Sequence, residues 1–348
     1  MMPVSKNLAG DWMRFLGEID RVRTQLRCSN SLAWFRGHAD SNWKLAPSLF
    51  RYGTSEDPDD NSEIRRHERD IDRVKKEWNE RLDRKTALKK EIQQSKERNQ
   101  SVEEMYHATC SAAKEKRAEL AERRRELLRF RAPINGEREL YDEFIFRAGK
   151  SSASNSWEVL AEMRHFGVPT RLLDWTDRLD IAFYFALEKY QALSESELSF
   201  PKAEEALKRL PEPCIWVLNP YHLSRRVAGR TAIWNLALDS GNDYYGLLLR
   251  GRKWPYDEPI PTYPPAPLER VRAQRGYFTV FGNNKQDMEA QLSEGLACVG
   301  RVPIPWQAAI FCLDYLSRIQ GLSQFEVYRD LDSLGRELVG RFARIHKR

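Results

Sequence analysis

The stretch from Asp59 to Ala132 contains neither glycine nor proline, and it constrains the fold of the chain more than any other feature. Apolar residues recur there at heptad-like spacing, with charged residues between them, which is typical of a coiled coil. The expected seam contains Ile64, Ile71, Trp78, Val102 and Met105. A polar break at 95–101 predicts two antiparallel helices, with a single long helix as the alternative. We therefore expect 59–130 to form a coiled-coil hairpin that is inserted into a domain and is available for a partner or for self-association.

The net charge of +6 bears on the choice of partner. A basic balance favours an anionic partner such as nucleic acid or a phosphorylated ligand, although a solvated surface rich in arginine accounts for it more simply. Within 59–132, acidic residues are interleaved with the arginines and lysines. Mixed charge of this kind is typical of the solvated face of a coiled coil and not of a nucleic-acid-binding arm.

Composition excludes several classes of protein. Hydrophobic residues make up 41% of the chain, enough for a substantial core. The five cysteines are far apart and include no CxxC pair, which predicts reduced thiols and neither a disulfide framework nor a metal site. No apolar stretch is long enough to span a membrane, and the first residues lack the apolar core of a signal peptide. We expect a cytoplasmic protein without a membrane partner.

Outside the hairpin, short apolar runs alternate with amphipathic segments, which predicts an α+β fold with a small mixed sheet and packed helices. The core domain is expected to be discontinuous, formed by 1–58 and 131–285, with 286–348 as a helical segment packed on it. The pattern predicts strands at 32–35 and 270–281, a helix from Ser156 to Gly167, and a proline-rich loop at 251–268. The residues expected in the core are Trp34, Leu172, Leu173, Trp175, Ala182, Phe183 and Phe185.

Several polar residues interrupt apolar stretches and are the candidate site. They are Arg36, Arg171, Asp174, Thr176 and Gln274. A buried arginine needs an anion or an acceptor, and Asp174 could serve Arg171 or Arg36. A satisfied core ion pair explains Arg171 and Asp174 as well as a functional role does. Arg36 stands beside Gly37 at the expected end of a strand, where a ligand can approach backbone and guanidinium together, and this favours function.

His165 is a further candidate, two residues before Gly167 at the expected helix end. A histidine is favourably placed there by the helix dipole, and this explanation stands beside a catalytic one. The chain has no HExxH, P-loop, GxGxxG or GxSxG motif. Only the polar residues inside apolar stretches therefore point to chemistry.

Three segments together resemble the FRG domain family, which is named for its Phe-Arg-Gly tripeptide. The first is Trp34-Phe35-Arg36-Gly37; the second runs from His165 to Thr176 and continues with Ala182-Phe183-Tyr184-Phe185-Ala186; the third is Arg270 or Arg272 with Gln274, Gly276 and Phe278. The second segment is long and specific, whereas the third is weaker alone. The resemblance covers about residues 28–335 without the hairpin.

The FRG domain in turn resembles ADP-ribosyltransferases in the order of its motifs, and the following roles are what that resemblance implies. Arg36 contacts the phosphates or ribose of NAD, with Gly37, Arg171 and His165 as further ligand-binding residues. Thr176 takes the second motif position, and Tyr184 stacks on nicotinamide. Gln274 takes the position where most such transferases have a glutamate that stabilises an oxocarbenium-like transition state. Because glutamine lacks the charge, that role shifts to Asp174.

The resulting expectation is an ADP-ribosyltransferase-like fold that uses NAD as substrate. Such a protein would act as a toxin or antiviral defence effector on a nucleic acid or protein acceptor. The alternative is a non-catalytic module that binds a nucleotide or nucleic acid in the same cleft, with the coiled coil as an interaction arm.

Overall fold

The chain forms two compact units, Met1–Gly53 with Asn135–Arg348 and, separately, Thr54–Ile134. The computed structural model describes residues 6–28, 33–51, 59–94, 100–130, 136–151, 154–191, 205, 207, 209–236, 238, 243–250, 254, 256, 258–265, 268–293, 297–316 and 321–346. Among these residues, no helix combines the length and apolarity needed to cross a membrane. Each unit is described by itself.

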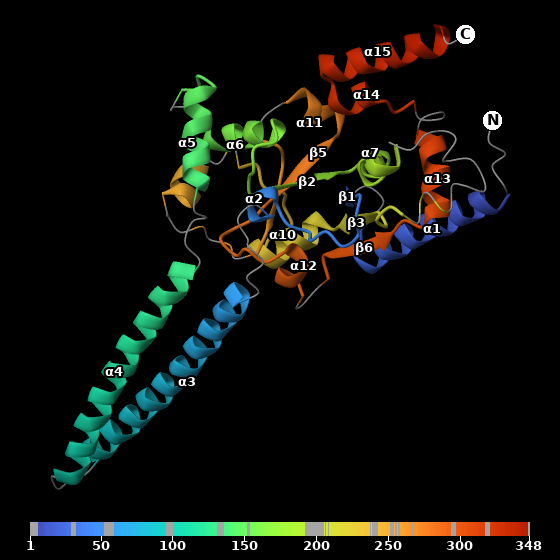
Figure 1. The fold of residues 1–348 in the computed structure, drawn as a ribbon. Helices are drawn as coiled ribbons and strands as arrows, with labels where there is room; N and C mark the ends of the chain where they lie inside the picture. Colours follow the sequence, from blue (N-terminus) through green and yellow to red (C-terminus); the bar gives the residue numbers. More distant parts are fainter. Residues whose placement is uncertain are drawn as a thin grey trace. The chain divides into compact units, whose positions relative to one another are not determined.

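The first unit is built on a six-stranded sheet with the order β4-β5-β2-β1-β3-β6 (Figure 1). The strands are β1 Trp34–His38, β2 Leu172–Thr176, β3 Cys214–Leu218, β4 Ile260–Thr262, β5 Gly276–Val280 and β6 Val299–Pro303. All neighbouring pairs in this order run antiparallel, and helices pack around them. The arrangement confirms the predicted α+β class.

The helices of this unit are mostly short. They are α1 Lys6–Gln25, α2 Ser48–Arg51, α5 Glu137–Arg147, α6 Ser156–His165, α7 Leu179–Ala186, α8 Glu188–Gln191, α10 Pro220–Ala228, η1 Tyr245–Leu249, α11 Glu269–Ala273, α12 Met288–Gln291, α13 Trp306–Asp314, α14 Gln324–Tyr328 and α15 Leu331–His346. The sequence predicts Ser156 as the cap of α6, but the side chain of Asn155 accepts from the first turn and Ser156 is the first helical residue. Gly167 follows α6 with φ of 80°, the left-handed conformation that ends many helices.

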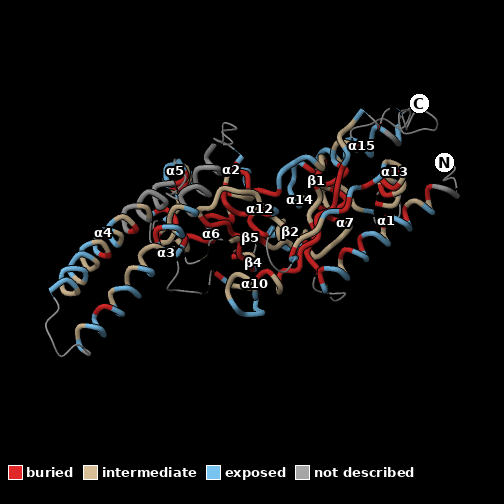
Figure 2. The backbone as a smooth tube through the Cα atoms, turned by 90° about the horizontal axis from the view of Figure 1, so that it is seen from below, coloured by how far each residue is buried: buried red, intermediate tan, exposed pale blue. Residues whose placement is uncertain are grey.

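Two clusters of buried side chains stabilise the two halves of the sheet. One joins α1, α7 and α13 to β1, β3 and β6, and the other joins α5 and α6 to β2, β4 and β5. Figure 2 shows buried residues gathered in the strands and on the inner sides of these helices. The residues predicted for the core are buried except Phe185, which is half-buried because it faces the cavity described below.

At Gly37, β1 lies so near its covering helix α7 that no side chain fits between them. The sequence places Arg36 and Gly37 at the end of the strand, but β1 continues to His38, and Gly37 pairs with Ile215 of β3. A Cβ atom at Gly37 would lie 2.0 Å from the carbonyl oxygen of Ala182 and 2.6 Å from the amide nitrogen of Ala186. Glycine is therefore required for α7 to pack against β1.

β4 lies inside the segment predicted to be a loop. Ile260–Thr262 pairs with β5 at the edge of the sheet, and Pro261 is its central residue. Proline is tolerated in an edge strand, because its missing N–H faces away from the neighbouring strand. The prediction of a loop is wrong here because proline content marks an edge strand as well as a loop.

The second unit consists of two long helices, α3 Asp59–Gln94 and α4 Gln100–Phe130. Lys116 bonds Glu77 across them at 2.7 Å; because both residues lie well back from the connection at 95–99, the helices run antiparallel. The residues most buried between them are Val74, Leu88, Ala113 and Leu120. Met105, predicted in the seam, is exposed because the seam of α4 runs through Tyr106 instead, one residue further on. The side chain of Ile64 lies outside the described residues.

Candidate functional site

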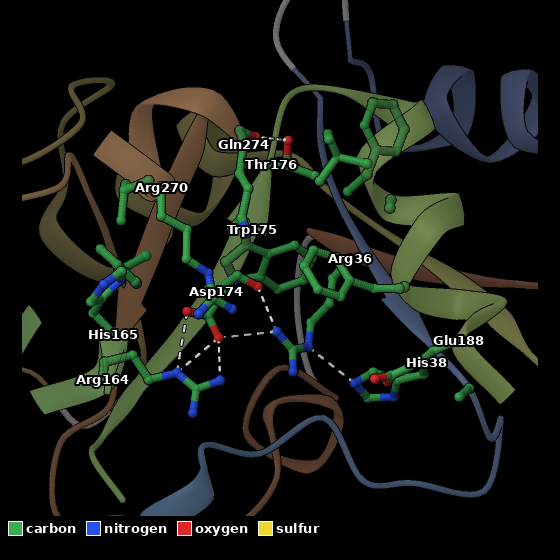
Figure 3. A pocket seen from close by; sticks show the side chains of 18 of the residues that line it. Arg36, His38, Arg164, His165, Asp174, Trp175, Thr176, Glu188, Arg270 and Gln274 are labelled. Atoms are coloured by element: carbon green, nitrogen blue, oxygen red, sulfur yellow. Dashed lines mark hydrogen bonds and ion pairs between the residues drawn. The ribbon is translucent and has the colours of Figure 1, made fainter. Parts of the chain in front are cut away.

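A cavity of about 380 Å³ opens beside the junction of β1 and β2. β1 joins β2 through the pair Phe35–Thr176, whereas β2 pairs with β5 from Leu172 to Thr176. The cavity is lined from β1, β2, α6, α7 and α11, and Figure 3 shows its principal side chains. Six of the predicted site residues are among them: Arg36, Gly37, His165, Asp174, Thr176 and Gln274.

Arg36 is held from two sides on β1. Its Nε donates to Nε2 of His38 at 3.1 Å, and its Nη1 donates to the main-chain oxygen of Asp174 at 2.9 Å and approaches Oδ2 at 3.5 Å. Burial lowers the pKa of Arg36 to about 10 against the opposing effect of Asp174, so the group stays charged at neutral pH. Its Nη2 makes no hydrogen bond to the described residues, and this leaves a fixed donor for a ligand.

Asp174 is paired mainly with an arginine that sequence reasoning misses. Arg164 of α6 donates to the carboxylate from Nε at 3.0 Å and from Nη2 at 2.5 Å, so Asp174 lies between Arg164 and Arg36 (Figure 3). Burial opposes ionisation of the carboxyl, but the charges of Arg164 and Arg36 outweigh it and lower the pKa of Asp174 to about 2. The sequence did not mark Arg164 as a site residue, because a charged residue near a helix end usually faces solvent.

His38, also missed, supports Arg36 from within the sheet. It is buried, and its Nδ1 lies 3.1 Å from the indole Nε1 of Trp216 on β3, while Nε2 faces Arg36. Burial, together with the charges of Arg36 and Arg51, lowers the pKa of His38 to about 2. The imidazole is therefore neutral and orients the guanidinium without adding charge to the cavity.

Thr176 and Gln274 meet through the main chain. The Thr176 hydroxyl donates to the carbonyl oxygen of Gln274 at 2.6 Å and accepts from the N–H of Arg178 at 3.0 Å. Both bonds fix the turn, so this hydroxyl acts structurally. Gln274 caps α11, where the sequence predicts a strand; Arg275 follows with φ of 46° and reverses the chain into β5. The residues of α11 are too few for their hydrophobic periodicity to distinguish a helix from a strand, and the sequence was therefore ambiguous here.

The side chain of Gln274 is held by the C-terminal part of the unit. Its Nε2 donates to the carbonyl oxygen of Val327 in α14 at 3.1 Å, and the neighbouring Arg270 lies over the ring of Tyr328 at 4.4 Å. The amide oxygen of Gln274 accepts no hydrogen bond from the described residues. That oxygen is the part of Gln274 available to a ligand hydroxyl.

His165 lines the cavity beside Arg270. Its Nδ1 is buried and has no hydrogen-bond partner in the part of the chain that the structure describes. Burial and the charge of Arg270 lower the pKa of His165, so the imidazole is neutral at physiological pH. A neutral imidazole in the lining of a cavity can bond a ligand or accept a proton from one.

The aromatic residue at the cavity differs from the predicted one. Tyr184 is buried in a cluster with Ile181 and Val327 and is not among the residues that line the cavity; burial raises the pKa of its phenol to about 12. Phe185, the next residue, does line it, as does Trp43, whose side chain is 42% exposed. Phe185 and not Tyr184 is thus the aromatic residue of α7 at the cavity, since successive residues of a helix face different directions.

Arg171 lies outside the cavity in a separate buried network. Its guanidinium pairs with Glu137 of α5, with a bond of 2.7 Å from Nε, and donates to the carbonyl oxygens of Phe281 and Gly282 at 2.9 and 2.7 Å. The hydroxyl of Tyr244 donates to the same Glu137 at 2.6 Å. Each nitrogen of the Arg171 guanidinium donates to a structural acceptor and Arg171 does not line the cavity, so its placement as a ligand contact is wrong.

The described residues hold no cluster of His, Cys, Asp or Glu side chains that could bind a metal ion. The charged residues that line the cavity are Arg36, Arg51, Arg164 and Arg270 against Asp174 and Glu188. With both histidines neutral, the cavity is positively charged. Its chemistry therefore suits an anionic ligand.

Comparison with known proteins bears on the segments that build this site. Residues 31–195 match the family model of the FRG domain, a range that includes β1, β2 and α7 but ends before Gln274. No curated protein and no solved structure matches the chain. The matched range has Phe35-Arg36-Gly37 on β1, beside the cavity, and ends shortly after α7 and α8. The chain therefore contains an FRG domain over residues 31–195.

Proposed function

We propose that the cavity binds NAD and that the domain transfers ADP-ribose from it to an acceptor. The observation that supports this most directly is the Arg36 guanidinium, which is fixed by His38 and Asp174 and has Nη2 left for a ligand. A preorganised guanidinium in a positively charged cavity is suited to a pyrophosphate, because it offers parallel donors without further loss of side-chain freedom.

The three motif segments are also neighbours in space. β5, β2 and β1 are adjacent strands; Arg36 lies on β1, Thr176 ends β2 and Gln274 precedes β5. This is the neighbourhood that the resemblance to ADP-ribosyltransferases implies. The volume of about 380 Å³ is near the low end of ligand pockets, roughly 300–1,000 Å³, so part of a dinucleotide would extend beyond the cavity.

The reaction would break the bond between the ribose C1′ and nicotinamide, which leaves with the bonding electrons, and form a bond from C1′ to the acceptor, which loses a proton. Asp174 would face the positive charge that develops on the ribose, although Arg164 and Arg36 offset much of its own charge. The Gln274 amide oxygen would accept from a ribose hydroxyl. His165, neutral and in the lining of the cavity, would accept the acceptor's proton.

The second candidate is a module that binds a nucleotide, or a nucleotide unit of nucleic acid, without turnover. It is favoured because three of the same residues lack a free charge or a free hydroxyl for catalysis. Gln274 carries no charge, the Thr176 hydroxyl is engaged in the turn, and the carboxylate of Asp174 is paired with two guanidinium groups. Each feature weakens stabilisation of a cationic transition state and leaves anion binding intact.

Calorimetric titration with NAD and chromatography of released nicotinamide separate the two candidates. The wild type should bind NAD, and Arg36→Ala should weaken binding about tenfold or more, as expected for a lost charged hydrogen bond. Arg138→Ala, which removes an exposed arginine on α5, is the matched control and should change nothing. Unaltered binding in Arg36→Ala would remove Arg36 from the site.

Nicotinamide release together with attachment of ADP-ribose to an acceptor would establish the transferase, whereas binding without release would leave the non-catalytic module. A transferase of this kind fits a toxin or antiviral defence effector that modifies a nucleic acid or protein. Expression of the wild type and of Arg36→Ala in a bacterial host tests this directly, because only the active protein should slow growth.

A further inference from the structure

Five apolar side chains form a row on α15, of which four are exposed to solvent and Leu334 is half-buried. Their spacing of three, four, four and three residues sets them on one face of the helix, since each residue turns it by about 100°. The row is Leu331, Leu334, Leu338, Phe342 and Ile345. Leu331 is 81% exposed, Leu338 45%, Phe342 65% and Ile345 69%. An apolar stripe of this length on one element marks an interaction surface.

α15 is attached to its unit by its polar side. Ser333 is fully buried, and its N–H donates to the Asp330 carboxylate at 2.7 Å, next to α14. By the turn per residue, Ser333 lies about 140° around the helix from the centre of the apolar row. Figure 1 shows α14 beside the start of α15. The described part of the unit therefore leaves the apolar face uncovered.

The pattern of the row favours a helix as its partner. Apolar positions alternating by three and four residues form the seam that interdigitates with a second helix. A helix that lies on an anionic membrane has instead a strongly basic polar face. The polar residues of α15 carry both signs, with Asp332 and Glu337 next to Arg336 and Arg341.

The charged residues on either side of the apolar row indicate which helix is the partner. Acidic Glu337 precedes basic Arg341 on one flank, and Asp332 near the start lies on the opposite flank from them, with His346 near the end. If two copies of α15 run antiparallel, residues on the same flank face each other. Glu337 of each copy then faces Arg341 of the other, and Asp332 faces His346. In a parallel pair opposite flanks would face each other, so Glu337 would not meet Arg341 of the other copy.

We propose that α15 of one copy packs antiparallel against α15 of a second copy, with the two Leu338 side chains near the centre. The surface is separate from the cavity and independent of NAD. A single pair of helices of this length buries less than a standard protein–protein interface, so the dimer should be weak and dependent on concentration.

Sedimentation equilibrium of the full chain tests the association. The wild type should dimerise as its concentration rises, and the double variant Leu338→Glu with Phe342→Glu should dimerise at least tenfold more weakly. Its melting temperature should be unchanged, because both side chains are exposed. Phe146→Glu, on α5 and 85% exposed, is the matched control and should dimerise like the wild type. A wild type that stays monomeric, or a dimer insensitive to the double variant, would overturn the proposal.

Disulfide trapping tests the direction. Leu331 and Ile345 are about 21 Å apart along the helix, whereas a disulfide needs Cα atoms within about 7 Å. Leu331→Cys mixed with Ile345→Cys should form the mixed cross-link, identified by mass spectrometry, and neither variant alone should link to itself at the new cysteine. Self-linked Leu331→Cys would overturn the antiparallel arrangement. Binding to phosphatidylserine vesicles by a monomeric wild type, lost in the double variant, would assign the row to a membrane surface instead.

Discussion

Arg36 donates from Nη1 to the main-chain carbonyl oxygen of Asp174 at 2.9 Å, so a side chain of β1 bonds the backbone of β2. The main-chain pair that joins the two strands is Phe35–Thr176, next to this bond. Arg36 therefore both connects the halves of the sheet and presents its remaining donor to the cavity. Mutations at this junction should separate the two roles.

Arg164→Ala should destabilise the fold more than Arg36→Ala does. Arg164 supplies the short bonds to the Asp174 carboxylate, whereas Arg36 Nη1 lies 3.5 Å from Oδ2. Loss of Arg164 should reduce the free energy of unfolding by about 1–3 kcal/mol, as for hydrogen bonds to a charged group. Urea denaturation of both variants measures the difference. An equal or reversed order would mean that Asp174 depends chiefly on Arg36.

Gly37→Ala should destabilise the protein strongly, because the new methyl group would meet the backbone of Ala182 and Ala186. Overpacking of this kind costs about 1–3 kcal/mol or more, since main-chain atoms cannot move aside as a flexible side chain can. Gly10→Ala in α1 is the matched control: its methyl group meets nothing, and alanine favours a helix by roughly 0.5–1 kcal/mol. Thermal unfolding should show opposite signs for the two changes, and a neutral Gly37→Ala would contradict the close packing of α7.

His38 should make the stability depend on pH below neutrality. Burial lowers its pKa in the folded protein to about 2 from 6.5, so below pH 6.5 the unfolded state binds a proton that the folded state does not. Stability is thus complete above pH 6.5 and falls with pH, by up to about 1.4 kcal/mol per unit for this group. Denaturation of the wild type and of His38→Gln between about pH 7 and 5 measures the contribution. If the free energy of unfolding of the wild type and of His38→Gln changed equally with pH, the pKa of His38 would be the same in the folded and unfolded states.

Leu173→Ala should reduce the free energy of unfolding by about 2–5 kcal/mol. Leu173 is the second residue of β2 and is 1% exposed, so its truncation leaves a cavity in a strand with neighbours on both sides. Leu238, 79% exposed, supplies the control, because its change to alanine removes no buried contact. Chemical denaturation should separate the two variants clearly; a cost near zero at Leu173 would be inconsistent with its burial.

Replacement of 62–129 by a short flexible linker should leave the first unit folded. The two helices form a compact unit of their own, and the antiparallel pairing of Glu77 with Lys116 shows that their outer ends return to the same side. The shortened protein should keep a cooperative thermal transition, followed by circular dichroism. Loss of cooperativity would show that the first unit needs the helical pair to fold.

Much of the fold could be predicted because it depends on local patterns. The apolar runs around Trp34 and Trp175 predict β1 and β2, and the stretch without glycine or proline predicts α3 and α4. What failed depends on short or ambiguous segments. β4 was concealed by its proline, and the residues before Gln274 suit a strand as well as the helix that they form.

The site could be predicted in part for a similar reason. Arg36, Asp174 and Gln274 stand out because they interrupt apolar stretches. Arg164 and His38 do not, since only the approach of α6 to β2, and of β3 to β1, gives them partners. Arg171 stands out just as Arg36 does, but its partner Glu137 lies far away in the sequence, so the pattern could not separate a structural arginine from a ligand-binding one.

The strand order determines the smallest piece of this chain that can fold. The match to the FRG domain family ends at residue 195 and includes β1 and β2, whereas the strands beside them, β3 and β5, follow later in the chain. A fragment limited to the matched range would expose an unpaired edge on both β1 and β2, and such edges promote aggregation. It would also lack both Gln274 and Val327, which holds the Gln274 side chain. The autonomous folding unit of this FRG domain therefore extends at least through α14.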